Sequence, residues 1–302
     1  MLIQLKGGRV IDPANNRDSI GDVYWENGRV VEAPEGREPD EVHDVSGKIV
    51  MAGAIDVHSH IAGTNVTLGR QLMPELPLIA ASQGQPFGPS PAAWGAYATG
   101  IRYAEMGYTT VIEPAMIPTH AIQAHKEMAS IPIIDVAGLV VLGNDDYTLN
   151  LLRKGKAKSD ELKEYVAWTL AHSKALGLKV INAGGSEAFK FNARTFDLDD
   201  EVPEYGVTSR GIVEVMQKVV ADLGVPHPPH VHTNNLGIAG NVETAVATLE
   251  ATQGHPIHLA HIQFYGYGNE GDKGFSSGAP ALMEAINKHK NATVDVGQVL
   301  FG

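Results

Sequence analysis

Short apolar stretches separated by turn residues fill the first part of the chain. They cover residues 2–5, 9–11, 22–25 and 29–32. Asn27-Gly28, between the last two stretches, is a typical hairpin dipeptide because both residues tolerate the left-handed backbone of a tight turn. The pattern predicts a small β-sandwich-like module over residues 1–50.

From residue 51 onward, apolar runs alternate with segments of helical periodicity. The first run, 54–57, ends in His58-Ser59-His60, and the others cover residues 109–112, 131–142, 178–182, 229–233, 257–264 and 292–300. The helical segments cover residues 91–106, 159–176, 208–223, 241–252 and 279–289, with Ser159 as a helix cap. This alternation predicts parallel βα units and an α/β fold of the (β/α)8, or TIM, barrel type over residues 51–302.

The predicted barrel is incomplete after strand seven. A closed barrel has eight strands, each followed by a helix. The chain ends directly after the seventh apolar run, so we expect it to be a fragment that lacks strand eight. Two glycine-rich segments, 61–90 and 265–278, are expected to be loops over the mouth of the barrel.

Composition narrows the class of protein further. With 43% hydrophobic and 19% charged residues, the chain has the balance of a soluble globular protein. A net charge of −12 argues against nucleic acid as a partner, and no apolar stretch is long enough to span a membrane. No secretory signal is recognisable, so a cytoplasmic location is expected. Because the chain has no cysteine, a metal would need nitrogen and oxygen ligands.

Histidines recur at the ends of three predicted strands. His58 and His60 follow the first, His230 and His232 end the fifth, and His258 and His261 end the sixth. An isolated His-x-His pair is more often two polar residues at a strand end than a metal site. Strand ends of a barrel converge at one face, however, so the recurrence indicates a shared metal centre. His230 and His258 fit equally well as structural residues beside the ligands.

Lys179 lies inside the apolar run of the fourth strand. A buried ammonium needs a partner, a lowered pKa or a chemical modification. Spacing alone favours an ion pair with Glu113 or Asp295. The alternative is that CO₂ has added to the amine, giving a carbamate that bridges two metal ions.

Three amide side chains, those of Asn234, Asn235 and Gln263, closely follow the histidines. They are candidates for binding substrate carbonyl or carboxylate groups. The equally plausible alternative is that they satisfy the backbone of their loops.

Together these motifs resemble the amidohydrolase superfamily. The order Asp56-x-His58-x-His60, Lys179, His232 and His261 matches that family throughout. Within it, the chain is most similar to the amidohydrolase-like subunits of formylmethanofuran dehydrogenase and of the bacterial formyltransferase/hydrolase complex. The stretches that carry this likeness are residues 56–63, 103–110, 179–185, 230–237 and 295–299.

The resemblance implies a binuclear zinc centre, with His58 and His60 on one ion and His232 and His261 on the other. Carboxylated Lys179 would bridge them, so the carbamate becomes the favoured interpretation of this residue. The implied reaction is hydrolysis, or formation, of the N-formyl amide of a methanofuran or methylofuran-type C1 carrier, within a complex of several subunits. The family's catalytic aspartate follows strand eight, beyond residue 302, and Asp295 on strand seven does not match it.

Two other functions stay open from the sequence. One is a non-catalytic scaffold subunit that keeps the barrel and organises its partners. The other is a cyclic-amide hydrolase of the dihydropyrimidinase or dihydroorotase type, which shares the same metal ligands.

Overall fold

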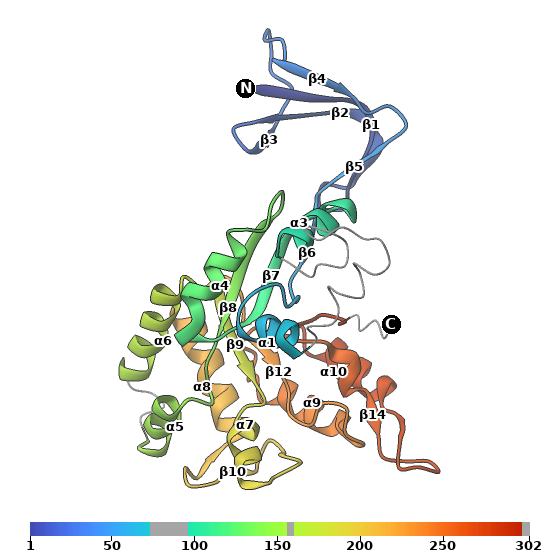
Figure 1. Ribbon diagram of the computed structural model, residues 1–302. Coiled ribbons are helices and arrows are strands. Elements are labelled where there is room, and N and C mark those ends of the chain that lie inside the picture. The colour runs from blue at the N-terminus through green and yellow to red at the C-terminus, as the bar shows by residue number, and fades with distance from the viewer. Residues whose placement is uncertain (73–95, 156–159, 298–302) are drawn as a thin grey trace, which may run out of the picture. The chain divides into compact units, whose positions relative to one another are not determined.

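The structure, a computed structural model, describes residues 1–72, 96–155 and 160–297 (Figure 1). The chain divides into two compact units, Met1–Ala54 and Ile55–Gly302. Among the described residues, no helix combines the length and the apolar character needed to cross a membrane.

The first unit is a five-stranded sheet built around the long strand β1 (Leu2–Asp12). β2 (Arg17–Glu26) pairs with β1 in antiparallel fashion and with β3 (Arg29–Val31) on its other side. β4 (Glu41–Asp44) and β5 (Ile49–Met51) both pair with β1 in parallel, along different stretches of it. The predicted hairpin at Asn27-Gly28 is confirmed, since both residues have positive φ and connect β2 to β3.

One prediction for this unit was wrong. The stretches 2–5 and 9–11 are not separate strands but parts of β1. The register with β2 shifts between Leu5 and Gly8, and Gly7 has φ 77°. A bulge of this kind interrupts the apolar alternation without ending the strand, which explains why the sequence pattern suggested two elements.

The second unit contains a seven-stranded sheet whose strands follow one another in chain order, as expected for consecutive βα units. The strands are β6 (Ala54–Asp56), β7 (Tyr108–Met116), β8 (Asp135–Val141), β9 (Gly177–Ile181), β12 (His230–His232), β13 (Ile257–Leu259) and β16 (Ala292–Val294). All seven predicted strands are present, and the predicted α/β barrel class is confirmed.

The sheet is strongly curved. In a flat sheet, six strand spacings would separate β6 from β16 by about 29 Å. Instead, His58 Nδ1, just after β6, lies 3.3 Å from Asp295 Oδ2, just after β16. The two edge strands therefore approach each other at their carboxyl ends, and the residues that follow the strands share one region.

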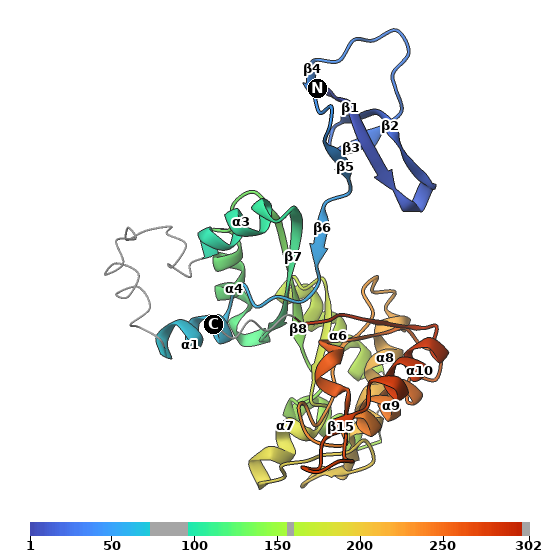
Figure 2. The ribbon, with the colours of Figure 1, turned by 90° about the vertical axis from the view of Figure 1, so that its right-hand side faces the viewer.

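Helices connect the strands and pack on the sheet. They are α1 (Thr64–Leu72), α3 (Ala96–Glu105), α4 (Ala121–Met128), α5 (Asp146–Arg153), α6 (Asp160–Ser173), α7 (Gly185–Ala188), α8 (Ser209–Asp222), α9 (Val242–Glu250) and α10 (Ala279–Lys288). α6 contacts α8, and α9 contacts α10 (Figures 1 and 2). α8 shows why such helices form: Thr208 caps its first turn by accepting the Gly211 N–H, and Ile212, Met216 and Val220 bury one face.

Several element boundaries differ from the prediction. The segment 131–142 becomes a strand only at Asp135, because Pro132 and Ile133, with φ 75°, break the extended backbone before it. The run 257–264 ends as a strand at Leu259, since His261 turns the chain with φ 35° into a 3-10 helix, Ile262–Tyr265. The run 292–300 ends as a strand at Val294.

The two expected loops contain regular structure. The segment 61–90 includes helix α1, and the segment 265–278 includes the short hairpin of β14 (Tyr267–Gly268) and β15 (Ser276–Ser277). Residues 73–90 of the first loop, residues 91–95 of one predicted helix and the predicted cap Ser159 lie outside the described residues. The other predicted helices are confirmed, each to within a few residues.

Candidate metal centre

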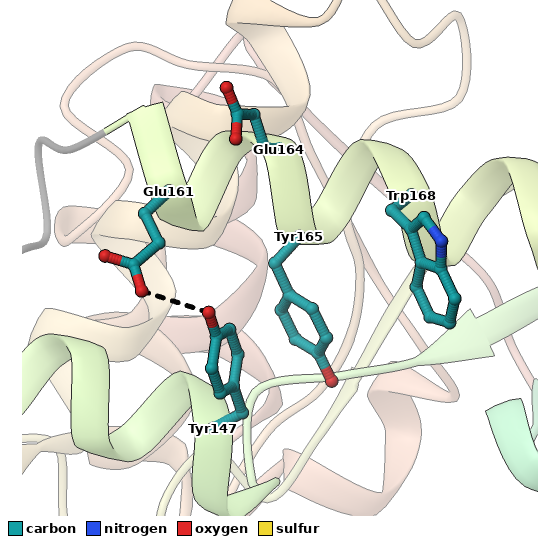
Figure 3. Close-up of a pocket in the computed structure, with 5 residues that line it drawn as sticks. All are labelled: Tyr147, Glu161, Glu164, Tyr165 and Trp168. Carbon is teal, nitrogen blue, oxygen red and sulfur yellow. Dashed lines mark hydrogen bonds between the residues drawn. The ribbon is translucent and has the colours of Figure 1, made fainter.

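A surface hollow between α5 and α6 is the first candidate site to consider. It has a volume of about 310 Å³ and is lined by Tyr147, Glu161, Glu164, Tyr165 and Trp168 (Figure 3). The Tyr147 hydroxyl donates a hydrogen bond to Glu161 within it. None of the histidines predicted as ligands contributes to this hollow, so it is separate from the predicted chemistry.

The predicted histidine ligands gather at the carboxyl ends of the strands. The ring centre of His58 lies 5.8 Å from that of His60 and 5.1 Å from that of His261. The His232 and His261 rings are 4.5 Å apart, with His261 Nε2 only 2.8 Å from His232 Nδ1. Imidazoles that end or follow β6, β12 and β13 thus lie close to one another.

Lys179 lies in the same region. Its position on β9 is in register with His230 on β12, and its side chain is 2% exposed. The amine Nζ has no hydrogen-bond partner among the described residues. Glu113 and Asp295 attract its charge from a distance, but burial dominates and lowers the pKa of Lys179 to about 7. Neither carboxylate forms the ion pair that spacing alone had favoured.

The imidazoles are held in their neutral form. Burial lowers the pKa of His230 and His232 to about 2 and that of His261 to about 4, and it also lowers the pKa of His58. Neutral imidazole is the form that donates a lone pair to a metal. The Nδ1 atom of His261 is buried without a hydrogen-bond partner among the described residues.

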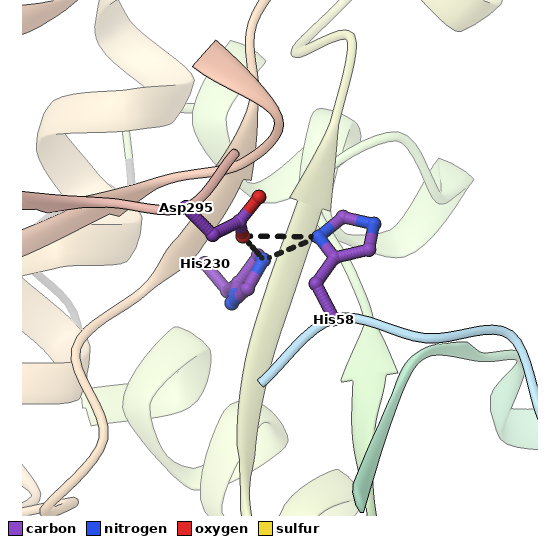
Figure 4. Close-up of side chains that lie close together, drawn as sticks. All are labelled: His58, His230 and Asp295. Carbon is purple, nitrogen blue, oxygen red and sulfur yellow. Dashed lines mark hydrogen bonds and ion pairs between the residues drawn. The ribbon is translucent and has the colours of Figure 1, made fainter. Parts of the chain in front are cut away.

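Asp295 is a central residue that the sequence pattern did not single out as a ligand. Its Oδ2 lies 3.0 Å from His258 Nε2 and 3.3 Å from both His58 Nδ1 and His230 Nε2 (Figure 4). Burial opposes its ionisation, but hydrogen bonds from these imidazoles and from the His261 N–H hold the pKa of Asp295 well below its usual value. One donor atom each from His58, His230 and Asp295 lie within 4.8 Å of one another.

A sequence signal for Asp295 did exist. The residue directly follows the seventh strand, which is the same kind of position that selected the histidines. The family resemblance pointed away from it, because the expected aspartate follows strand eight. The structure instead places Asp295 against His58, which follows the strand at the other edge of the sheet.

Glu113, within β7, supports the loop that carries His60. The carboxylate is 1% exposed and accepts hydrogen bonds from the backbone N–H groups of Ile61, Ala62 and Ala115. Its Oε1 also lies 3.1 Å from His60 Nδ1. The sequence suggested Glu113 only as a partner for Lys179.

His230 and His258 are more buried than the predicted histidine ligands. Their side chains are almost fully buried, with ring centres 4.4 Å apart. His258 Nδ1 lies 2.8 Å from the Thr293 hydroxyl, and His227 Nε2 lies 3.4 Å from His230 Nδ1. These imidazoles form a buried polar layer beneath the cluster of His58, His232 and His261.

Internal hydrogen bonds engage the three predicted substrate-binding amides. The Asn234 amide donates to Ala183 O and to the Ser209 hydroxyl, while its Oδ1 is buried without a partner. Asn235 accepts the Phe196 N–H and donates to Asp197 and Thr244. Gln263 hydrogen-bonds both backbone groups of Gly297. Each amide therefore joins loops around the mouth of the barrel.

A cavity of about 400 Å³ adjoins Asn234 and Asn235. Its lining comes from the segments after β9 and β12 and includes Asn182, Ser186, Phe189, Arg194, Phe196 and Leu236. Asn182 is three residues beyond Lys179, and Asn234 is two residues beyond His232. The cavity therefore neighbours the cluster of predicted ligands in sequence, and it is large enough for a small molecule.

The donor set fits the divalent metal ions of this kind of barrel. Four neutral imidazoles and an unpartnered buried amine lie together without cysteine. Imidazole nitrogen with carboxylate oxygen is a ligand set that Zn²⁺ accepts. A buried amine with no partner is hard to explain as a purely structural feature.

Comparison with known proteins identifies the family. The Amidohydrolase family matches residues 41–302, and the chain belongs to this family. The class agrees with the curved βα sheet and with the histidines at its strand ends.

Two curated relatives match nearly the whole chain. The A subunit of the formyltransferase/hydrolase complex Fhc of Methylorubrum extorquens is 50% identical, over 100% of this chain and 56% of the relative. Protein FwdA of Methanocaldococcus jannaschii is 38% identical, over 98% of this chain and 54% of the relative. The chain thus spans about half the length of these relatives.

One solved structure matches equally well. The crystal structure of the formyltransferase/hydrolase complex FhcABCD from Methylorubrum extorquens, in complex with methylofuran, contains a chain with a TM-score of 0.91 and 49% identity. The match covers 100% of this chain and 55% of that one. The likeness extends to the whole described fold, including the small N-terminal sheet.

Proposed function

We propose that this chain is the metal-binding part of an amidohydrolase subunit that hydrolyses, or forms, the N-formyl amide of a methanofuran or methylofuran-type C1 carrier. The observation that carries the proposal is the unpartnered buried amine of Lys179 in the region where the imidazoles of His58, His60, His232 and His261 gather. The relatives named above supply the substrate class, because one is a subunit of a formyltransferase/hydrolase complex and the solved structure of that complex contains methylofuran.

We propose a binuclear zinc centre at the cluster. His58 and His60 would hold one ion, His232 and His261 the other, and carboxylated Lys179 would bridge them. When bound, the ions would polarise the formyl carbonyl and lower the pKa of water at the site.

The lowered pKa of Lys179 favours its carboxylation. At neutral pH a sizeable fraction of the amine is unprotonated, with a lone pair that can attack CO₂. A bond forms between Nζ and the carbon of CO₂, the nitrogen loses one proton to solvent, and an anionic carbamate results. A buried cation without a partner is thereby replaced by an anion with oxygen ligands for metal.

Amide hydrolysis also needs substrate positioning and proton transfer. Water adds to the formyl carbon, the C–N bond breaks, the carrier amine gains a proton and formate is released. We assign substrate contacts to Asn234, Asn235 and Gln263, which border the mouth of the barrel. The family resemblance assigns proton transfer to an aspartate after strand eight.

The same relatives support a proposal on partners. We expect the full-length protein to work with other subunits of a formyltransferase/hydrolase or formylmethanofuran dehydrogenase type of complex. The high similarity to a chain of the FhcABCD structure supports this expectation.

The test is release of formate from an N-formyl furan-type carrier by the full-length protein, purified with its associated subunits. His58→Ala and Lys179→Ala should each reduce kcat/KM by at least about 100-fold, because each removes a ligand of the centre. His172→Ala, which changes an exposed imidazole on α6, is the matched control and should leave the rate unchanged. Metal analysis should find at least one zinc or similar ion per chain.

Two outcomes would contradict the proposal. Formate release that survives both substitutions would indicate a scaffold subunit, with the chemistry located elsewhere. Turnover of dihydroorotate or a dihydropyrimidine, with no activity on the formylated carrier, would indicate a cyclic-amide hydrolase instead.

A further inference from the structure

Each of the two histidines after β6 faces a carboxylate with the same ring nitrogen. His60 Nδ1 lies 3.1 Å from Glu113 Oε1, and His58 Nδ1 lies 3.3 Å from Asp295 Oδ2. Glu113 comes from β7, next to β6 in the sheet, whereas Asp295 follows β16 at the opposite edge. Each imidazole thus faces one carboxylate at Nδ1, and the two carboxylates come from different parts of the sheet.

Neither carboxylate is free to turn away. Glu113 accepts three backbone N–H groups, two on Oε2 and one on Oε1. Asp295 Oδ1 accepts the His261 N–H at 2.5 Å, and Oδ2 is 3.0 Å from His258 Nε2. The orientation of each carboxylate is therefore fixed by groups other than the imidazole it faces.

A fixed carboxylate determines where the imidazole carries its proton. A carboxylate only accepts hydrogen bonds, so a nitrogen lone pair pointing at it from about 3 Å is repelled, whereas an N–H is attracted. His58 Nδ1 is also 2.9 Å from His230 Nε2, so only one of these two nitrogens carries a proton. A proton on His58 Nδ1 is accepted both by Asp295 Oδ2 and by the Nε2 lone pair of a His230 that is protonated on Nδ1, where it faces His227 Nε2. The proton of His58 and of His60 is then on Nδ1, and the lone pair is on Nε2.

We propose that Glu113 and Asp295 are positioning residues that hold His60 and His58 as Nδ1–H tautomers, so that both present Nε2 to a metal ion. The proposal rests on the metal centre proposed above. Metal-binding histidines generally donate their other N–H to a carboxylate or carbonyl, and here both acceptors come from strands distant from the ligands in sequence. It also explains why Asp295 contacts the cluster without being one of its predicted ligands.

Isosteric amides provide the sharpest test. In Asp295→Asn, the side-chain oxygen remains on the His261 N–H, so the NH₂ group turns toward His58. In Glu113→Gln, the oxygen remains on the Ile61 and Ala62 N–H groups, so the NH₂ group turns toward His60 and the hydrogen bond from the Ala115 N–H is lost. Each NH₂ requires a lone pair on Nδ1, which moves the proton to Nε2 and blocks the ligand atom.

Glu127→Gln is the matched control. Glu127 also fixes the loop after β6, by accepting the Gly63 N–H and the Thr67 hydroxyl, and its Oε1 further accepts the Gln123 amide. This variant therefore measures the effect of replacing a glutamate that hydrogen-bonds this loop by its amide, apart from any change of a histidine tautomer.

The first measurement is metal affinity of the full-length protein, by competition for Zn²⁺ with a chromophoric chelator and by the visible spectrum of Co²⁺-loaded protein. Asp295→Asn and Glu113→Gln should each weaken affinity by about 10- to 100-fold and alter the Co²⁺ spectrum. Glu127→Gln should match the unsubstituted protein. Unchanged affinity and spectrum in the two test variants would overturn the proposal.

The second measurement is the tautomer itself, from long-range ¹H–¹⁵N NMR of metal-free protein labelled with ¹⁵N-histidine. The unsubstituted protein should show Nδ1–H for His58 and His60, and an Nε2–H signal from either would overturn the proposal. This measurement needs no folded variant and no bound metal. It also separates the two proposals, since absence of metal binding in the unsubstituted protein would reject the centre, whatever the tautomers are.

Discussion

At the scale of single residues, Lys179 makes the metal-free protein less stable than its apolar packing alone would allow. Its side chain is buried among imidazoles, and its amine has no hydrogen bond among the described residues. In the unfolded chain the same amine is hydrated and charged. The difference in environment is what lowers its pKa to about 7, and the same difference opposes folding.

We predict that Lys179→Met stabilises the metal-free, CO₂-depleted protein at pH 7 by on the order of 2–4 kcal/mol. The folded pKa lies below the unfolded value, so the penalty is full below about pH 7 and disappears as pH rises toward 10.5. In urea denaturation, Lys179→Met should therefore raise the free energy of unfolding by a large amount at pH 7 and by a small amount at pH 10. Lys218→Met, at an exposed lysine of α8, is the control and should change stability by no more than about 0.5 kcal/mol. Destabilisation by Lys179→Met would contradict the prediction.

The buried imidazoles predict acid sensitivity. Burial and then the charge of His258 lower the pKa of His227 to about 4. As pH falls below about 6.5, the unfolded chain takes up a proton at this residue before the folded chain does, so acid favours unfolding.

His227→Gln should therefore reduce the pH dependence of the metal-free protein. Between about pH 6 and pH 4.5, the slope of the unfolding free energy should fall by up to about 1.4 kcal/mol per pH unit, the value for one proton. Denaturant midpoints measured across this range provide the test. His172→Gln should keep the slope of the unsubstituted protein, and an equal slope in both variants would show that His227 is not responsible.

At the scale of elements, the turn between β9 and α7 brings the segment after Lys179 to the edge of the cavity. Gly184 permits this turn, because it has φ 74° and because an added Cβ would lie 2.5 Å from Val202 Cγ2 and 3.0 Å from Phe196 Cε1. Its N–H also donates to Asn144 Oδ1 at 2.8 Å. The position is therefore restricted both by backbone conformation and by space.

Gly184→Ala should destabilise the protein by about 2–4 kcal/mol, from left-handed strain together with a steric clash. Gly254→Ala is the matched control. Gly254 has φ 84° but no atom within 4 Å of the added Cβ, so it reports the strain alone, about 1 kcal/mol. Thermal denaturation of both variants separates the two contributions, and equal losses would show that no clash occurs at Gly184.

Elements were predictable from the sequence where the apolar pattern was long. α8 and α10 fall within a residue of their predicted bounds. Short elements were missed: α1 carries apolar side chains only at Val66, Leu68 and Leu72, too few to distinguish a helix from a loop. The end of β13 was also missed, because the left-handed turn at His261 depends on its tertiary contacts and not on its residue type.

At the scale of the whole molecule, the histidine cluster was predictable because barrel topology places all strand ends at one face. The contacts between the two edges of the sheet were not predictable from the sequence. Asp295 meets His58 only because the sheet curves far enough to bring β16 to β6, and no local pattern encodes that distance. Lys179 was recognised as unusual, but only the structure shows that neither Glu113 nor Asp295 reaches its amine.

A bound metal ion should stabilise the second unit against unfolding. The proposed ligands come from four different strands, so an ion bound to them stabilises the folded chain by RT ln(1 + [metal]/Kd). With Zn²⁺ at about 100 times Kd, unfolding should cost about 2.7 kcal/mol more. Calorimetry of the full-length protein with and without Zn²⁺ provides the measurement. His58→Ala should lose most of this gain, and an equal gain in that variant would place the bound ion elsewhere.

The meeting of His58 with Asp295 has a consequence for biosynthesis. His58 emerges early from the ribosome and Asp295 more than two hundred residues later. The His58 imidazole is therefore synthesised long before the carboxylate that faces it. The carboxylate that faces His58 Nδ1 can therefore reach it only after synthesis has passed residue 295.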